Sequence, residues 1–212
     1  MRLATPEEVL SVRAITVSDG SLATAGVALD YSYPIICRLL DTELSEGKVT
    51  DYFTIEEGDA ENRTRLRTTN AFLDKKTVVV RITANGLPLL SEEDGEVLSP
   101  LHYTYSADTG IFRLLNYITS GILCLSITYA HGFSPTDNDE NVLDVPDWLK
   151  GAASYMANSV LTTQPASPAT KRDNNRNNNY SSQAYRQAVQ MLSPHYRMRM
   201  SVLYPDKSDV HG

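Results

Sequence analysis

The sequence predicts an α+β protein: a small helical bundle, an inserted antiparallel β-sheet and an extended C-terminal tail. Apolar residues recur every three or four positions in two distant stretches, 19–42 and 146–163, which indicates two helices that face a common core. The sequence between them alternates and is rich in β-branched and aromatic residues, as strands are. The predicted regions are N-terminal bundle helices at 1–47, a β region at 48–133, an acidic loop and return helix at 134–163, a flexible linker at 164–180 and a C-terminal docking segment at 181–212.

The first helix has a clear start signal. Thr5 can cap the helix, Pro6 suits its first position, and Glu8 completes a capping box with Thr5. A second, longer helix starts at Ser18 or Asp19, and Pro34 inside it predicts a kink or a split.

The β region contains four or five short strands. Alternating residues in KVTDYFTIEE, TVVVRITANG and GILCLSITY each predict a strand. The stretch LHYTYSADTGIFRLL predicts a hairpin, because Gly110 can supply the positive φ that its turn requires.

The last strand ends in a corner before the return helix. Gly132 allows the chain to turn where a Cβ atom would clash, and Tyr129 and Phe133 are expected to fill the space between sheet and bundle. Pro146 and Trp148 then open the return helix, with acidic residues where the helix dipole favours negative charge.

Charge is distributed unevenly along the chain. The net charge is −7, yet residues 165–212 carry seven basic residues against three acidic ones. An acidic body repels nucleic-acid phosphates. The basic tail is compatible either with nucleic acid or with an acidic protein surface.

The sequence contains no motif of a known catalytic or metal site. It has no nucleophile elbow, phosphate-binding loop or HExxH pattern, and its four histidines lack ligand spacing. Asp137, Asp139 and Asn141 open like a calcium loop, but Val142 stands where glycine is needed, so a solvated acidic loop is favoured. We expect no enzyme activity, no cofactor, no metal and no membrane span, and two buried thiols at Cys37 and Cys124.

Four segments together resemble the head-to-tail adaptor (connector, or head-completion) proteins of tailed bacteriophages. They are MRLATPEEVLSV, IICRLLDT, LSITYAHGF and VPDWLKGAASYMANSVL, and the resemblance spans roughly residues 1–163. It implies a structural subunit of the virion neck, assembled in the host cytoplasm, in a ring of about twelve copies beneath the portal. The implied partners are the portal protein, tail or tail-terminator proteins, other copies of the chain, and double-stranded DNA that passes through the lumen without sequence-specific binding.

C-terminal segments of such proteins typically reach toward the portal, and the resemblance therefore assigns docking to the end of this chain. Aromatic, Met and Arg side chains are suited to that task. The predicted docking residues are Tyr185, Tyr196, Arg197, Met198, Arg199, Met200, Leu203 and Tyr204. Two alternatives remain at this point: a tail terminator or tail-completion protein, and a small binding module that uses the basic tail on nucleic acid.

Overall fold

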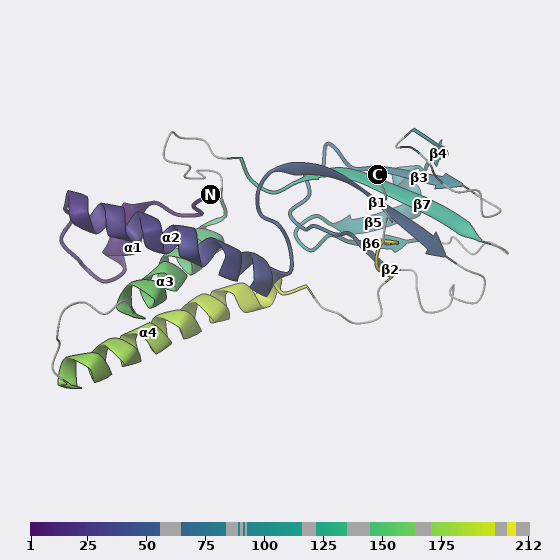
Figure 1. The fold of residues 1–212 in the computed structure, drawn as a ribbon. Coiled ribbons are helices and arrows are strands. Elements are labelled where there is room, and N and C mark those ends of the chain that lie inside the picture. Colours follow the sequence, from purple (N-terminus) through teal and green to yellow (C-terminus); the bar gives the residue numbers. More distant parts are fainter. Residues whose placement is uncertain are drawn as a thin grey trace. The chain divides into compact units, whose positions relative to one another are not determined.

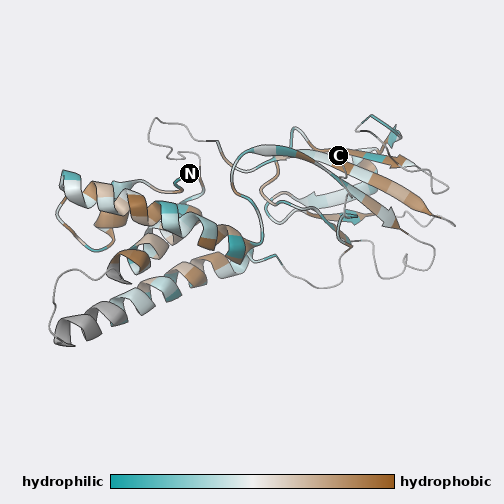
Figure 2. Cartoon of the chain, in the orientation of Figure 1, coloured by the Kyte–Doolittle hydropathy of each residue, from teal (hydrophilic) through white to brown (hydrophobic). Residues whose placement is uncertain are grey.

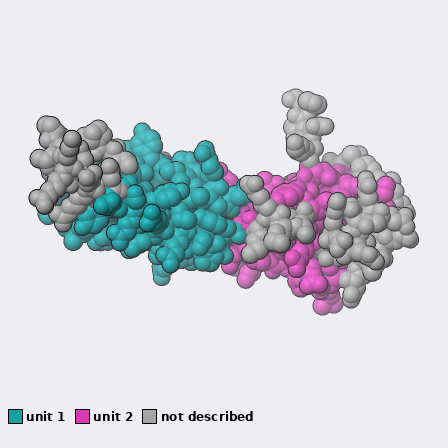
Figure 3. All heavy atoms as spheres, turned by 90° about the horizontal axis from the view of Figure 1, so that it is seen from below, with its two compact units in different colours: residues 1–41, 133–196 teal, residues 42–132, 197–212 magenta. Residues whose placement is uncertain are grey.

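The computed structural model describes residues 1–55, 65–83, 89, 91, 93–115, 122–134, 145–163, 171–197 and 203–206, with backbone alone at 162–163 and 171–178. The chain divides into two compact units (Figure 3). The helical unit comprises residues 1–41 and 133–196, and the β unit comprises residues 42–132 and 197–212. The predicted α+β class is confirmed.

The N-terminal helices follow their sequence signals. Helix α1 (Pro6–Ser11) carries the predicted capping box, since Thr5 Oγ1 accepts from the Glu8 N–H and the Glu8 carboxylate accepts from the Thr5 N–H at 2.7 Å. Helix α2 (Asp19–Leu40) is capped by Ser18 and ends at Asp41 in the left-handed conformation. Pro34 lies inside α2 without splitting it, contrary to one of the two predicted outcomes.

Helix α3 (Asp147–Thr163) is the centre of the helical unit. It packs against α1, α2 and α4 (Lys171–Leu192), and it lies between α2 and α4 in Figure 1. The predicted contact between residues 19–42 and 146–163 is therefore present. The fully buried side chains of α3 are Leu149, Ala152, Ala153, Met156 and Ala157.

Helix α4 differs from the predicted linker at 164–180. Residues 171–180 are helical and continue to Leu192, followed by the short 3₁₀ helix η2 (Ser193–His195). Packing explains the helix: Ala188 and Leu192 are fully buried. Hydrophobic and hydrophilic bands alternate along α4 (Figure 2), as expected for an amphipathic helix packed on one side. Residues 171–180 therefore extend a helix whose buried side chains lie further along the chain, beyond the predicted linker.

The β unit contains two antiparallel sheets. The first has the order β1 (Gly47–Ile55), β7 (Leu123–His131), β3 (Val79–Thr83) and β4 (Glu96–Val97). The second has the order β2 (Arg65–Arg67), β6 (Ile111–Leu114) and β5 (Tyr103–Ser106), and the 3₁₀ helix η1 (Pro100–His102) precedes β5. The predicted hairpin is β5–β6, with Gly110 at φ +64°.

One hydrophobic core joins the two sheets. Phe53, Leu125 and Ile127 from the first sheet and Leu66 and Phe112 from the second are all buried in it. β7 pairs with β1 on one side and β3 on the other, so it is central in its sheet, and hydrophobic residues colour much of its length (Figure 2). The sequence did not reveal β2 and β4, which are only three and two residues long.

The chain returns to the β unit after η2. Leu203 forms a parallel bridge with Leu66, in which the Leu203 N–H donates to the Arg65 carbonyl and the Arg67 N–H donates to the Leu203 carbonyl, each at 2.9 Å. The Asp206 N–H donates to the Tyr52 carbonyl at 2.7 Å. The C-terminal segment is thus part of the β unit where the structure describes it.

Candidate functional site

Two of the predicted docking residues lie in the helical unit. Tyr185 projects from α4 and is 44% exposed. Tyr196 follows η2 and is partly buried; burial raises its pKa, and the neighbouring Tyr185 raises it further. This end of α4 therefore presents an aromatic surface to solvent.

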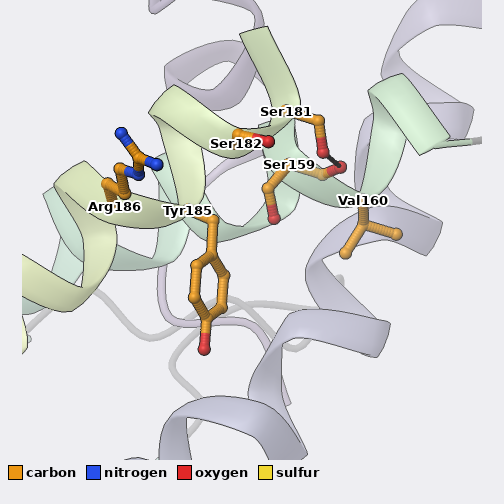
Figure 4. Close-up of a pocket in the computed structure, with 6 residues that line it drawn as sticks. All are labelled: Ser159, Val160, Ser181, Ser182, Tyr185 and Arg186. Carbon is orange, nitrogen blue, oxygen red and sulfur yellow. Dashed lines mark hydrogen bonds between the residues drawn. The ribbon is translucent and has the colours of Figure 1, made fainter. Parts of the chain in front are cut away.

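Tyr185 lines a groove between α3 and α4, which we call the α3–α4 groove (Figure 4). The Ser181 hydroxyl donates to the Ser159 carbonyl at 2.9 Å and joins the two helices there. The hollow measures about 530 Å³. Its lining combines an aromatic ring, an aliphatic side chain, hydroxyls and a guanidinium: Ser159, Val160, Ser181, Ser182, Tyr185 and Arg186.

Arg197 belongs to the interior of the β unit, where it was not expected. It is only 6% exposed. Its Nε donates to the Thr109 carbonyl at 2.9 Å, its Nη1 to the Thr69 carbonyl at 2.7 Å, and its Nη2 to the Thr68 carbonyl. These bonds hold the guanidinium inside its own unit, so the predicted availability for docking is wrong for this residue.

The remaining docking residues are also divided. Leu203 packs against the core of the β unit. Tyr204 is 48% exposed, with the Arg67 guanidinium 5.4 Å from its ring centroid. Met198, Arg199 and Met200 lie outside the described residues. Of the predicted set, Tyr185 and Tyr196 belong to the helical unit, and Leu203 and Tyr204 belong to the β unit.

The predicted corner has the expected backbone at Gly132. Its φ is +80°, and a Cβ atom there would collide with the carbonyl oxygens of Ser45 and Leu44. Tyr129, however, is completely buried within the core of the β unit instead of filling a space beside it. Phe133 is partly buried and begins the return of the chain to the helical unit.

Backbone hydrogen bonds and a ring contact both hold the start of the return helix. The Pro146 carbonyl accepts from the Leu149 and Lys150 N–H groups at 2.8 and 3.1 Å, which makes it the first acceptor of α3. The Trp148 ring stacks on His195, with 3.6 Å between ring centroids. Trp148 therefore connects the beginning of α3 to η2, which directly follows α4.

A buried polar cluster in the β unit was not predicted. The Asp51 carboxylate accepts from the Thr69 N–H and hydroxyl at 2.6 Å each and from the Tyr129 hydroxyl at 2.7 Å. The Tyr129 hydroxyl in turn accepts from the Asn70 N–H at 3.0 Å, and the Asn70 side-chain amide lies 3.1 Å from His131 Nε2. The cluster ties β1 and β7 to residues 69–70.

Burial controls protonation in this cluster. Burial, assisted by the Asp51 carboxylate, raises the pKa of Tyr129, so its hydroxyl keeps its proton and remains a donor. Burial lowers the pKa of His131, against the opposing effect of Glu43 and Asp51. Both rings are nearly inaccessible, at 0% and 6% exposed. The cluster therefore stabilises the fold, since a substrate has no access to these groups.

No protein-family model and no curated protein matches the chain. Any function assigned to the chain must therefore be argued from its own residues.

Two further observations concern the described residues only. The described residues include no group of three or more His, Cys, Asp or Glu side chains placed to hold a metal ion. None of their helices has the length and apolar character needed to cross a bilayer. The acidic loop with Asp137, Asp139 and Asn141 lies outside them.

The buried polar cluster and the α3–α4 groove were not predicted, and the sequence signals for them differ in strength. Nothing in the spacing of Asp51, Asn70 and His131 indicates that they meet, because strand pairing brings them together. The α3–α4 groove was hidden by the expectation of a linker before Tyr185. With a helix there instead, Ser181, Ser182 and Tyr185 fall at the three- and four-residue spacing of one helical face.

Proposed function

We propose that the chain is a structural subunit of a bacteriophage neck ring that joins the portal vertex to the tail and lines part of the DNA channel. The observation that carries the proposal is that α2 packs on α3 within one unit although the β unit separates them in the sequence, with Gly132 at the return corner. This is the arrangement that the resemblance of residues 1–163 implies. The proposed role is non-catalytic.

Charge supports the proposal. Outside residues 165–212 the chain has a formal charge of −11, since the whole chain carries −7 and that segment carries +4. A negative wall repels DNA phosphates and therefore lets a duplex slide past without adhering. Among the basic residues of the C-terminal segment, Arg197 donates to backbone carbonyls and is not available to phosphates.

The proposal is tested with purified chain, portal rings of the same virus and a labelled DNA duplex. Native mass spectrometry should detect a ring near twelve copies when portal is present. If the chain does not bind portal but binds the DNA duplex and retards its migration, the proposal is contradicted and a nucleic-acid-binding module is favoured. Free monomer without portal is compatible with the adaptor, since assembly then depends on the portal template.

A tail terminator is separated from an adaptor by the particle that the chain decorates. Tailless, DNA-filled heads and isolated tails are incubated with labelled chain and imaged. We expect the label at the portal vertex of the heads. Label on isolated tails alone would place the chain in the tail and overturn the adaptor proposal.

A further inference from the structure

Helix α2 has apolar side chains on two opposite faces. One face is buried in the helical unit and includes Ala25, Leu29 and Ile36. The other face is exposed and its residues follow the i, i+4, i+7, i+8 spacing of a single helical stripe. We call it the α2 patch: Val27 (45% exposed), Tyr31 (61% exposed), Pro34 and Ile35 (36% exposed).

Single exposed apolar residues need no explanation, but a stripe over more than two turns does. In a helix that already has one buried face, a second apolar face indicates a second packing partner. Asp30, which is paired with Arg2 at 3.0 Å, borders the α2 patch, and exposed Arg38 follows it one turn further on. The patch is thus apolar at its centre and charged at its rim, like a protein interface.

The α3–α4 groove is a different surface of the same unit. α3 packs against α2 and against α4, so the outer face of α2 and the groove lie on different elements around α3. The groove offers Tyr185 and Arg186, residue types that often dominate binding at protein interfaces. A surface pair of this kind permits contacts that repeat from copy to copy, as a ring requires.

Charge composition favours association between copies. Residues 1–41 contain five acidic and three basic residues, whereas α4 contains four basic residues and one acidic residue. Opposite net charges on the two segments attract a second copy in a head-to-tail orientation. They disfavour contact of like segments, such as α4 against α4.

We propose that the α2 patch of one copy packs against the α3–α4 groove of a second copy. This inference rests on the proposed ring function and names the surfaces that would build the ring. Four partly exposed side chains bury less than the ~800 Å² per partner of a stable interface. The contact is therefore weak between two free copies and becomes effective when a template holds many copies side by side.

Cysteine cross-linking tests the pairing directly. In a background in which Cys37 and Cys124 are replaced by alanine, one protein carries Tyr31→Cys and the other carries Ser182→Cys. Mild oxidation of the concentrated mixture should give a mixed dimer, because the contact brings the two thiols of different copies together. The matched control pairs Ser182→Cys with Leu101→Cys, a position that is 84% exposed and lies in the β unit.

The yield of mixed disulfide dimers decides the test. A mixed Tyr31→Cys/Ser182→Cys dimer well above the Leu101→Cys control supports the proposal. Yields equal to the control, or disulfide formation only between two Tyr31→Cys copies, would overturn it. The second result would indicate a symmetric α2–α2 contact.

A charge substitution gives an independent readout on the intact chain. Tyr31→Glu should weaken self-association by about tenfold or more, because it introduces a charge at the centre of the patch. Leu101→Glu, which introduces the same charge at an exposed apolar position elsewhere, should leave association unchanged. Because free copies associate only weakly, the two variants are compared by sedimentation on portal rings, and equal assembly of the two contradicts the proposal.

Failure of this inference and failure of the proposed function are distinguishable. If rings form on portal but Tyr31→Glu does not impair them and no mixed dimer appears, the surfaces are wrong and the ring function stands. If mixed dimers form but the chain binds no portal, the self-contact stands and the neck function is wrong.

Discussion

Among single residues, Arg197 places a positive charge in the interior of the β unit. A buried guanidinium is tolerated only when its donors are satisfied, and here the carbonyls of Thr68, Thr69 and Thr109 accept from it. The same bonds satisfy carbonyl groups of two separate turns. Arg197 therefore stabilises those turns against each other.

Replacing Arg197 should destabilise the β unit. Arg197→Ala removes charge-assisted hydrogen bonds and leaves buried carbonyls without that donor, which costs roughly 2–4 kcal/mol in free energy of unfolding. Urea denaturation monitored by circular dichroism measures the loss. Arg113→Ala, at an exposed position on β6, is the control and should change stability by less than ~0.5 kcal/mol. Equal effects of the two substitutions would contradict the role assigned to Arg197.

His131 should make folding stability depend on pH. Burial lowers its pKa below the ordinary value of 6.5, so near that pH the unfolded chain binds a proton that the folded chain does not. Stability is therefore complete above the unfolded-state pKa and is lost as pH falls from there toward the lowered folded-state pKa. His131→Gln should remove this part of the pH dependence, as seen in denaturation midpoints compared at neutral and mildly acidic pH.

The control for this prediction is His102→Gln, at an exposed position in η1. Carboxylates also titrate in acid, so the informative quantity is the difference between variants. If His131→Gln and the wild type lose stability equally between neutral and mildly acidic pH, the interpretation of His131 is wrong.

At the scale of elements, the Gly132 corner ends β7 and starts the return of the chain. Gly132→Ala should destabilise the protein by roughly 2–4 kcal/mol, since alanine disfavours φ +80° and its Cβ would meet backbone oxygens that cannot move aside easily. Gly20→Ala is the matched control. Gly20 lies in α2 with no atom near its would-be Cβ, so alanine should stabilise the helix by ~0.5–1 kcal/mol. Thermal unfolding measures both; a neutral Gly132→Ala would show that the corner is not constrained.

Elements with strong local signals were predictable from sequence. The Thr5–Glu8 capping box specifies the start of α1, and alternation in residues 123–131 specifies β7, because each signal acts within a few residues. Residues 171–180 of α4 were not predictable from composition, since they continue a helix whose packing on α3 involves Ala188 and Leu192 further along the chain. Pro34 did not split α2, which is one continuous helix from Asp19 to Leu40.

The candidate site was less predictable than the fold. Tyr185, one of the predicted docking residues, is exposed, and its docking role stays a prediction. Arg197 has the same sequence character as a docking residue, yet long-range contacts bury it. Residue type specifies what a side chain can bind, whereas its exposure depends on the whole chain.

At the scale of the whole molecule, the chain passes between its two units three times, after residues 41, 132 and 196. The third passage brings Arg197, Leu203 and Asp206 onto the β unit. Deletion of residues 181–212 should therefore weaken both units. The helical unit would lose the buried residues Ala188 and Leu192, and the β unit would lose its C-terminal segment.

The last prediction isolates this contribution. Two proteins are compared. The first is residues 42–132 alone. In the second, a Gly–Ser linker of about 15 residues, which spans roughly 20 Å, joins residues 42–132 to residues 197–206. The joined protein should be more stable by roughly 2–4 kcal/mol, because it regains the Arg197 bonds, the Leu203 bridge and the bond from the Thr54 hydroxyl to Asp206 at 2.7 Å. Urea midpoints measure the difference, and slower amide exchange at Arg67 should accompany it, since its N–H donates to Leu203. The same joined protein with Arg197→Ala should recover only part of the gain. Identical midpoints with and without residues 197–206 would mean that the C-terminal segment lies on the β unit without stabilising it, leaving those residues available to a partner.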